Sequence, residues 1–261
     1  MTQIIAVNNQ KGGVAKTTSC LSLGASLAEM GYTVLLIDLD PQAHLTLSLG
    51  LKPEALHRTI GDVLLGHYSI MGVSRESPVF DLDIVPANQS LALVDKLLYE
   101  QNSYEFQLKQ RLAAIEENYY EFVLIDCPPS FSALTLNALT AANLLIIPVQ
   151  CEYYAAQSLP RIMKLAKLVQ SKTNPALTYH LLVTMFDRRN KICHLILEQL
   201  QRQMSHILYD TIIEVDTKLR ESPAFGQPIN QYAPETRGAQ QYRNLAQELI
   251  SNGRPRSKKT T

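Results

Sequence analysis

Two lysines flank a glycine pair near the start of the chain, in the stretch VNNQKGGVAKTT that covers residues 7–18. The usual phosphate-binding loop has the pattern G-x-x-x-x-G-K-[ST], with a glycine at each end. Gln10 and Ala15 occupy the two glycine positions here, and Lys11 is an additional lysine. The stretch therefore predicts a phosphate-binding loop that departs from the usual pattern, with a Gly-rich turn capping a helix as the alternative.

The residue types of this loop suit the phosphates of a nucleotide. Backbone N–H groups can converge on phosphate oxygens, and the positive end of a following helix attracts negative charge. Lys16 would place a charge on the β- and γ-phosphates, and the Thr17 hydroxyl would bind Mg²⁺. ATP and Mg²⁺ are thus the expected cofactors, and the expected nucleotide contacts in the loop are Gly12, Gly13, Val14, Ala15, Lys16, Thr17 and Thr18.

Ala15 sets a condition on the backbone of the loop. A Cβ atom is costly at positive φ, where glycine is normally found. We therefore expect the backbone at Ala15 to be right-handed and helix-like, since the helix begins close to this residue.

Three carboxylates follow apolar runs further along the chain. Asp38 and Asp40 lie in DLDPQ, and Asp126 ends the run FVLID. Side chains two apart in a strand share a side, so Asp38 and Asp40 would both face a γ-phosphate and hold Mg²⁺ through water or orient an attacking water. Asp126 fits the strand-end aspartate that reaches Mg²⁺ through water. The predicted magnesium site comprises Thr17, Asp38 and Asp126, and a polar strand end turned by Pro41 is the alternative for DLDPQ.

The elements that would position these groups alternate along the chain. Apolar runs typical of buried strands cover 4–8, 33–38, 83–87, 122–126, 144–149, 180–186 and 211–215. Helical patterns lie between them, at 17–30, 91–117, 134–142, 157–171, 190–206 and 235–251. This alternation predicts an α/β fold with a mostly parallel sheet and helices on both faces. Because ligands bind at the carboxyl ends of such strands, the three motifs are expected at one edge of the sheet.

A length of 261 residues fits one large α/β domain or two small ones. Because the sequence shows no linker and no repeat, we expect one domain at 1–251, followed by a basic flexible tail at 252–261. Four cysteines occur without a C-x-x-C pair, which favours reduced thiols in a cytoplasm. Residues 1–150 contain 8 Lys or Arg against 15 Asp or Glu, whereas residues 151–261 contain 16 against 9. The basic second part could bind a polyanion, with an ordinary salt-bridged surface as the alternative.

The motifs KGGVAKTT, DLDPQ and DCPPS, in this order and spacing, resemble those of the deviant-Walker ATPases of the ParA/MinD family. The loop satisfies that family's looser rule, K-G-G-x-x-K-[ST]. The likeness continues through PVQCEYYA, TMFDRR, KLRESPAFGQPI and PETRGAQQY, which are similar to ParA more than to MinD. The resemblance covers nearly the whole chain and implies the P-loop NTPase fold.

The resemblance also implies roles for individual residues. In the family the first lysine crosses a dimer interface to the ATP of the other subunit, so Lys11 implies an ATP-dependent homodimer. Asp40 matches the aspartate of hydrolysis and Asp38 assists it, which gives a catalytic set with Lys11 and Lys16. Glu152 lies where the family has a position on the dimer face. Intrinsic ATP hydrolysis is expected to be weak and to be stimulated by DNA and a partner.

ParA proteins bind double-stranded DNA nonspecifically as the ATP dimer. By this resemblance Arg220 is the foremost phosphate contact, and Arg237 is instead a structural residue near the nucleotide base. For each basic residue a solvated surface charge is the alternative. The candidate DNA contacts are Arg188, Arg189, Lys191, Lys218, Arg220 and Arg243.

The implied function is to position or partition a carboxysome, plasmid or chromosome on the nucleoid, with a ParB-like or McdB-like adaptor stimulating hydrolysis. Ala15 and the 190–210 region resemble the carboxysome-distributing McdA type. One alternative is a MinD-like membrane-associated regulator, but the tail SNGRPRSKKTT lacks the large apolar residues of a membrane-binding helix. The other is a metabolic enzyme of the dethiobiotin synthetase type.

Overall fold

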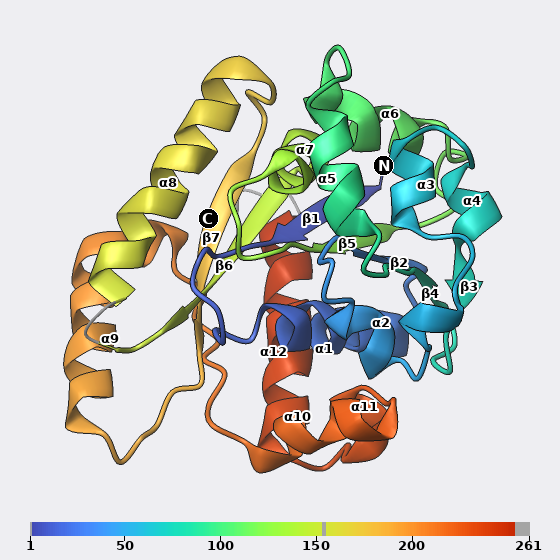
Figure 1. Cartoon of the computed structure of the whole chain (residues 1–261). Coiled ribbons are helices and arrows are strands. Elements are labelled where there is room, and N and C mark those ends of the chain that lie inside the picture. Colours follow the sequence, from blue (N-terminus) through green and yellow to red (C-terminus); the bar gives the residue numbers. More distant parts are fainter. Residues whose placement is uncertain (1, 153–154, 254–261) are drawn as a thin grey trace, which may run out of the picture.

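The computed structural model describes residues 2–152 and 155–253. Seven strands form one sheet in the order β3-β4-β2-β5-β1-β6-β7 (Figure 1). Every neighbouring pair is parallel except β3 with β4. The strands are β1 Gln3–Val7, β2 Val34–Asp38, β3 Arg75–Glu76, β4 Leu82–Val85, β5 Phe122–Asp126, β6 Leu144–Gln150 and β7 Thr178–Thr184.

Helices cover both faces of the sheet. Figure 1 shows α8 and α9 beside β6 and β7 at one end, and α3 and α4 near β3 and β4 at the other. The helices are α1 Lys16–Glu29, α2 His44–Ser48, α3 Ile60–Leu64, α4 Ile70–Val73, α5 Leu91–Leu98, α6 Gln107–Ala113, α7 Ala133–Ala141, α8 Ala155–Lys172, α9 Lys191–Met204, α10 Thr217–Glu221, α11 Ile229–Tyr232 and α12 Arg237–Gly253.

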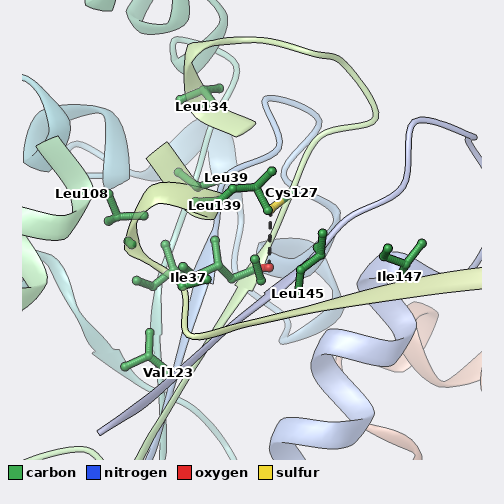
Figure 2. Packing of buried hydrophobic residues seen from close by; sticks show 14 of the residues in the cluster. Ile37, Leu39, Leu108, Val123, Cys127, Leu134, Leu139, Leu145 and Ile147 are labelled. Carbon is green, nitrogen blue, oxygen red and sulfur yellow. Dashed lines mark hydrogen bonds between the residues drawn. The ribbon is translucent and has the colours of Figure 1, made fainter. Parts of the chain in front are cut away.

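Two apolar cores follow from the alternation of side chains along each strand. In β2, Leu35 and Ile37 point to a core that includes side chains of α5, α6, α7 and α8, whereas Val34 and Leu36 point to a core with α1 and α12. Figure 2 shows the first core, to which Ile37 of β2, Val123 of β5 and Leu145 of β6 contribute. Burial on both faces explains why the strands read as nearly continuous apolar runs, and it confirms the predicted fold class.

Two predicted elements are wrong in detail. The stretch 211–215 is not a strand, although it runs beside the end of β7 with hydrogen bonds from Ile213 N to Val183 O (2.9 Å) and from Val215 N to Phe186 O (3.1 Å). The pairing is limited to an isolated parallel bridge between Phe186 and Glu214, and the N–H of Glu214 points away from β7 to the side chain of Gln241 (2.9 Å).

The predicted helix 91–117 is interrupted between α5 and α6. Ser103 adopts a left-handed conformation, with φ 54°, and a short 3₁₀ turn at Tyr104–Phe106 follows. At the other end of the chain, α12 continues to Gly253, into the stretch that we expected to be tail. Residues 254–261 of that expected tail lie outside the described residues.

Candidate nucleotide site

The loop between β1 and α1 is held from two neighbouring strands. The Gln150 amide of β6 donates to the Gly13 carbonyl oxygen (2.9 Å), and the Thr184 hydroxyl of β7 donates to the Val14 carbonyl oxygen (3.1 Å). The Ala15 carbonyl oxygen then accepts the first hydrogen bond of α1, from Ser19 N (2.9 Å). The parallel arrangement of β1, β6 and β7 thus shapes the phosphate-binding loop.

Ala15 does not have the expected right-handed backbone. Its φ and ψ are 63° and 35°, and Gly13 also has positive φ, 75°. The left-handed conformation costs a residue with a Cβ roughly 1–2 kcal/mol. The two bonds from β6 and β7 fix the carbonyl groups of Gly13 and Val14, which directly precede Ala15, so the surrounding fold imposes the conformation on an unfavourable residue type.

The two lysines of the loop occupy different surroundings. Lys16 is buried, and its Nζ donates to the Lys11 carbonyl oxygen (3.2 Å). Burial lowers the pKa of Lys16, and the carboxylates of Asp126 and Asp40 oppose that shift. Lys11 instead directs its Nζ to Glu152 Oε2 (2.5 Å) and Gln150 Oε1 (3.1 Å). Lys16 therefore serves the loop of its own chain, whereas Lys11 lies at the outer side of the loop.

Gln150 was not singled out from the sequence. Its amide bonds Lys11, the Gly13 carbonyl oxygen and the sulfur of Met185 (2.8 Å). Only its place at the end of a predicted strand, between PV and CE, pointed toward the site. It connects the first lysine to the backbone of the glycine pair.

A hydroxyl and a carboxylate suited to Mg²⁺ lie together at the start of α1. Thr17 Oγ1 donates to Asp126 Oδ2 at 2.6 Å. Asp126 is buried, and its other oxygen has no hydrogen-bond partner among the residues that the structure describes. Burial, and then the charge of Asp38, raise the pKa of Asp126 well above its usual range. A divalent cation would supply the missing partner and favour the ionised form, so these residues fit Mg²⁺.

Asp38 is fully buried at the end of β2, opposite Asp126 of β5. Its Oδ2 accepts hydrogen bonds from the amide and hydroxyl of Thr46 (2.9 and 2.7 Å), and its Oδ1 accepts one from Asp40 N (3.1 Å). Burial raises the pKa of Asp38 to about 6 despite these bonds. Both oxygens are engaged within the chain, an arrangement that orders residues 38–46. No sequence signal connected Thr46 to this carboxylate.

Asp40 lies closer to solvent than Asp38. Its Oδ1 accepts a hydrogen bond from Gln42 N (2.9 Å), and its charge acts on Lys16. An acid near the phosphate-binding lysine, with one oxygen not used by that bond, is placed to orient a water molecule.

A cavity of 330 Å³ adjoins the phosphate-binding loop. Loop residues form one wall, and the segment 213–216 with α10 forms another. Sequence reasoning missed this wall because it read 211–215 as a strand. The lining residues are Gly13, Ala15, Thr18, Met185, Ile213, Glu214, Val215, Asp216, Leu219, Arg220, Pro223 and Tyr242. Arg237 pairs with Glu214 (2.8 Å), which agrees with the structural role predicted for it.

The candidate DNA contacts do not form one uniform surface. Arg243 is largely buried and makes two hydrogen bonds with Glu29 (2.8 and 2.9 Å). Three others are each paired with a carboxylate: Arg188 with Glu214, Arg189 with Asp187, and Lys218 with Glu221. The two exposed ones that make no ion pair with another described residue are Lys191 and Arg220.

Two further properties of the described residues concern membrane spans and cysteine pairing. Within 2–152 and 155–253, no helix is both long enough and apolar enough to cross a membrane. The four cysteines are buried, free thiols.

The sheet is mostly parallel, a lysine-bearing loop joins its inner strand β1 to α1, and a threonine–aspartate pair lies beside that loop. Together these features define a P-loop nucleotide-binding protein. A family model described as an AAA domain matches residues 2–179. The chain is 40% identical over 254 residues to the sporulation initiation inhibitor protein Soj of Bacillus subtilis, covering 97% of this chain and 100% of that protein. It is 37% identical over 259 residues to the chromosome partitioning protein ParA of Caulobacter vibrioides, covering 98% and 97%. The chain belongs to this ParA/MinD-like family of ATPases, in the company of the ParA and Soj chromosome-partitioning proteins.

Solved structures agree with that assignment. A Mycobacterium smegmatis structure called cobyrinic acid a,c-diamide synthase, with bound ATP analogue and magnesium, has a TM-score of 0.83 at 34% identity and covers 97% of this chain and 96% of its own. Cyanothece apo McdA has a TM-score of 0.84 at 19% identity, covering 95% and 100%, which shows a shared fold. The chain is an ATP hydrolase that uses ATP with Mg²⁺, as its sequence predicted.

Proposed function

We propose that this chain is a ParA-type switch whose ATP-bound form dimerises, binds double-stranded DNA without sequence preference and positions or partitions a cargo. The placement of Lys11 carries the proposal. Lys16 already serves the loop of its own chain, whereas the Lys11 ammonium lies at the partly exposed outer side, 2.5 Å from Glu152. A charge in that position can reach the nucleotide of a second copy, and this makes dimerisation depend on ATP.

Within each subunit the residues have separate tasks. The loop backbone and Lys16 bind the phosphates, and Thr17 with Asp126 holds Mg²⁺. Asp40 orients the attacking water, while Asp38 holds the 38–46 segment through Thr46. Glu152 lies at the dimer face, where it positions Lys11.

DNA binding is assigned first to Arg220 and Lys191, because both are exposed and free of ion pairs with other described residues. Contacts to phosphates give affinity without sequence reading and weaken steeply with salt. A ParB-like or McdB-like adaptor on the cargo stimulates hydrolysis and releases the dimer from the nucleoid.

The names of the relatives favour a chromosome as the cargo. The structure of a putative plasmid partition protein from Borrelia burgdorferi, with a TM-score of 0.80 at 25% identity, supports a plasmid as the next candidate. For a carboxysome as the cargo, the support is the fold that the chain shares with McdA. The gene beside this one is informative: a centromere-binding protein favours a replicon, and a small adaptor among carboxysome genes favours the organelle.

Binding of the full chain to a random-sequence DNA duplex, measured with ATP, ADP and no nucleotide, tests the proposal. Only the ATP form should bind DNA and sediment as a dimer. Equal DNA binding with ADP, or a monomer with ATP and Mg²⁺, contradicts the switch.

The name of the Mycobacterium smegmatis structure favours a second candidate, an enzyme that uses ATP to activate a small acid. ATP turnover separates the two functions. A rise with DNA plus adaptor supports the switch, and a rise with a carboxylic acid and an amide donor, without DNA, supports the enzyme.

A further inference from the structure

Glu214 is a buried carboxylate that joins three parts of the fold. It accepts hydrogen bonds from Arg188, in the loop after β7 (2.5 Å), and from Gln241 of α12 (3.0 Å). Arg237, at the start of α12, pairs with its other oxygen (2.8 Å). The side chain of Glu214 is 7% exposed, whereas those of Arg188 and Arg237 are 67% and 54% exposed. One buried negative charge therefore neutralises part of two largely exposed positive charges.

The same residue separates two hollows of the surface. Glu214 lines the 330 Å³ cavity beside the phosphate-binding loop. It also lines an outer groove of 420 Å³, to which Arg188, Asp210 and Asn244 contribute. Arg188 is fixed at this groove, because the ring of His194 bonds its carbonyl oxygen (2.7 Å) while Glu214 bonds its guanidinium.

We propose that Glu214 limits the DNA affinity of the chain by competing with DNA phosphates for Arg188. This inference rests on the proposed DNA binding. A DNA phosphate that approaches Arg188 meets a guanidinium already paired with a carboxylate. The contact therefore releases fewer of the counterions condensed on the DNA, and it contributes less binding free energy than a contact with an unpaired arginine. Removing a buried partner of two arginines raises the positive potential of the groove. Glu214 is thus an affinity-setting residue that acts through Arg188 and keeps the bound state reversible.

The test measures the affinity of the full chain, with ATP and Mg²⁺, for a random-sequence duplex between about 50 and 200 mM salt. Glu214→Gln keeps the size of the side chain and removes its charge. We expect about fivefold tighter binding, the size of an exposed ion pair, and a salt slope more negative by about 0.9, equivalent to one phosphate contact. A slope equal to that of the wild type overturns the inference.

Asp210→Asn is the matched control, because Asp210 lines the same groove but its carboxylate makes no ion pair with a described residue. It should leave the salt slope unchanged. A double-mutant cycle then isolates the pair, since the effect of Glu214→Gln should fall to less than half in an Arg188→Gln background, where only Arg237 is left to be released. An effect of undiminished size without Arg188 also overturns the inference.

A second comparison holds even if Glu214→Gln does not fold, because it changes exposed residues only. Arg188→Gln should reduce the salt slope by less than half as much as Arg220→Gln, which removes an arginine without a carboxylate partner. Equal reductions contradict the competition. If the wild type with ATP does not bind DNA at all, the proposed function fails, and this inference fails with it.

Discussion

The ammonium of Lys11 and the carboxylate of Glu152 form an ion pair within one chain, 2.5 Å apart. The lysine that distinguishes this loop is therefore oriented by β6 and the residues after it before any partner arrives. Both side chains are partly exposed, so the pair contributes at most about 1 kcal/mol and can exchange for a phosphate at small cost.

Lys11→Ala should leave a monomer that retains ATP, because Lys16 and the loop backbone remain. Dimerisation and DNA binding with ATP should both be lost, as measured by sedimentation and by fluorescence anisotropy of a labelled duplex. Lys52→Ala removes an exposed lysine away from the loop and should behave as the wild type. Full DNA binding by Lys11→Ala would remove Lys11 from the mechanism.

Asp40→Ala should reduce ATP hydrolysis on the order of 10²-fold or more while the ATP dimer accumulates, because the residue orients the attacking water. Phosphate release and nucleotide binding are measured on the same preparation. Glu54→Ala, which removes an exposed acid, is the control. Brisk hydrolysis by the Asp40 variant would assign the water to another residue.

The free energy of unfolding of the nucleotide-free chain should depend on pH through Asp38. Its folded pKa is about 6 against an ordinary value of 3.8, so the folded state holds a proton that the unfolded state releases between these values. Stability therefore falls as pH rises from about 4 to 6, by on the order of 3 kcal/mol from this group. Denaturant unfolding at several pH values should show this decline in the wild type relative to Asp38→Asn. A parallel pH profile for the two proteins would contradict the assignment.

Ala15→Gly should retain ATP binding and raise the free energy of unfolding by up to about 1 kcal/mol. Glycine removes the cost of a Cβ at φ 63°, and the greater freedom of the unfolded chain offsets part of the gain. Ala28→Gly, within right-handed α1, should instead destabilise by about 1 kcal/mol. Equal destabilisation by both changes would show that the loop is relaxed at Ala15.

Arg220→Glu should weaken DNA binding while sparing nucleotide binding, because Arg220 is exposed and makes no ion pair with another described residue. Arg243→Glu should instead lower the thermal midpoint, because it places a like charge against Glu29 and removes three hydrogen bonds, two to Glu29 and one to the Pro234 carbonyl oxygen. DNA affinity and thermal unfolding of both variants are compared. If Arg220→Glu bound DNA as the wild type does, the phosphate contacts would lie elsewhere.

The sequence was sufficient for the fold class and the phosphate-binding loop because both depend on local patterns. Near-continuous apolar runs specify buried parallel strands, and the spacing of Lys11, the glycines and Lys16 specifies the loop. It was insufficient where distant segments decide the outcome. Ala15 takes its conformation from bonds made by Gln150 and Thr184, which are more than 130 positions away.

The same limit applies to the basic residues. Arg220 and Arg243 are both arginines in the basic part of the sequence, yet the packing of α12 against α1 brings Glu29 to Arg243 and not to Arg220. Glu214 was read as part of a strand, and only the tertiary structure shows it between Arg188 and Arg237. Ion pairs between separate elements follow no spacing that a single sequence reveals.

The two ends of the sheet have a consequence for self-association. At one end β3 consists of Arg75 and Glu76 alone, a short, charged and antiparallel edge. At the other, β7 is flanked by the chain around 208–215, which bonds to its backbone at Leu181 and Val183. Neither edge offers a long open row of backbone groups to which another sheet could add. The edges of the described sheet therefore do not favour strand addition between copies of this chain, and the dimer that we propose would form through the nucleotide-binding face instead.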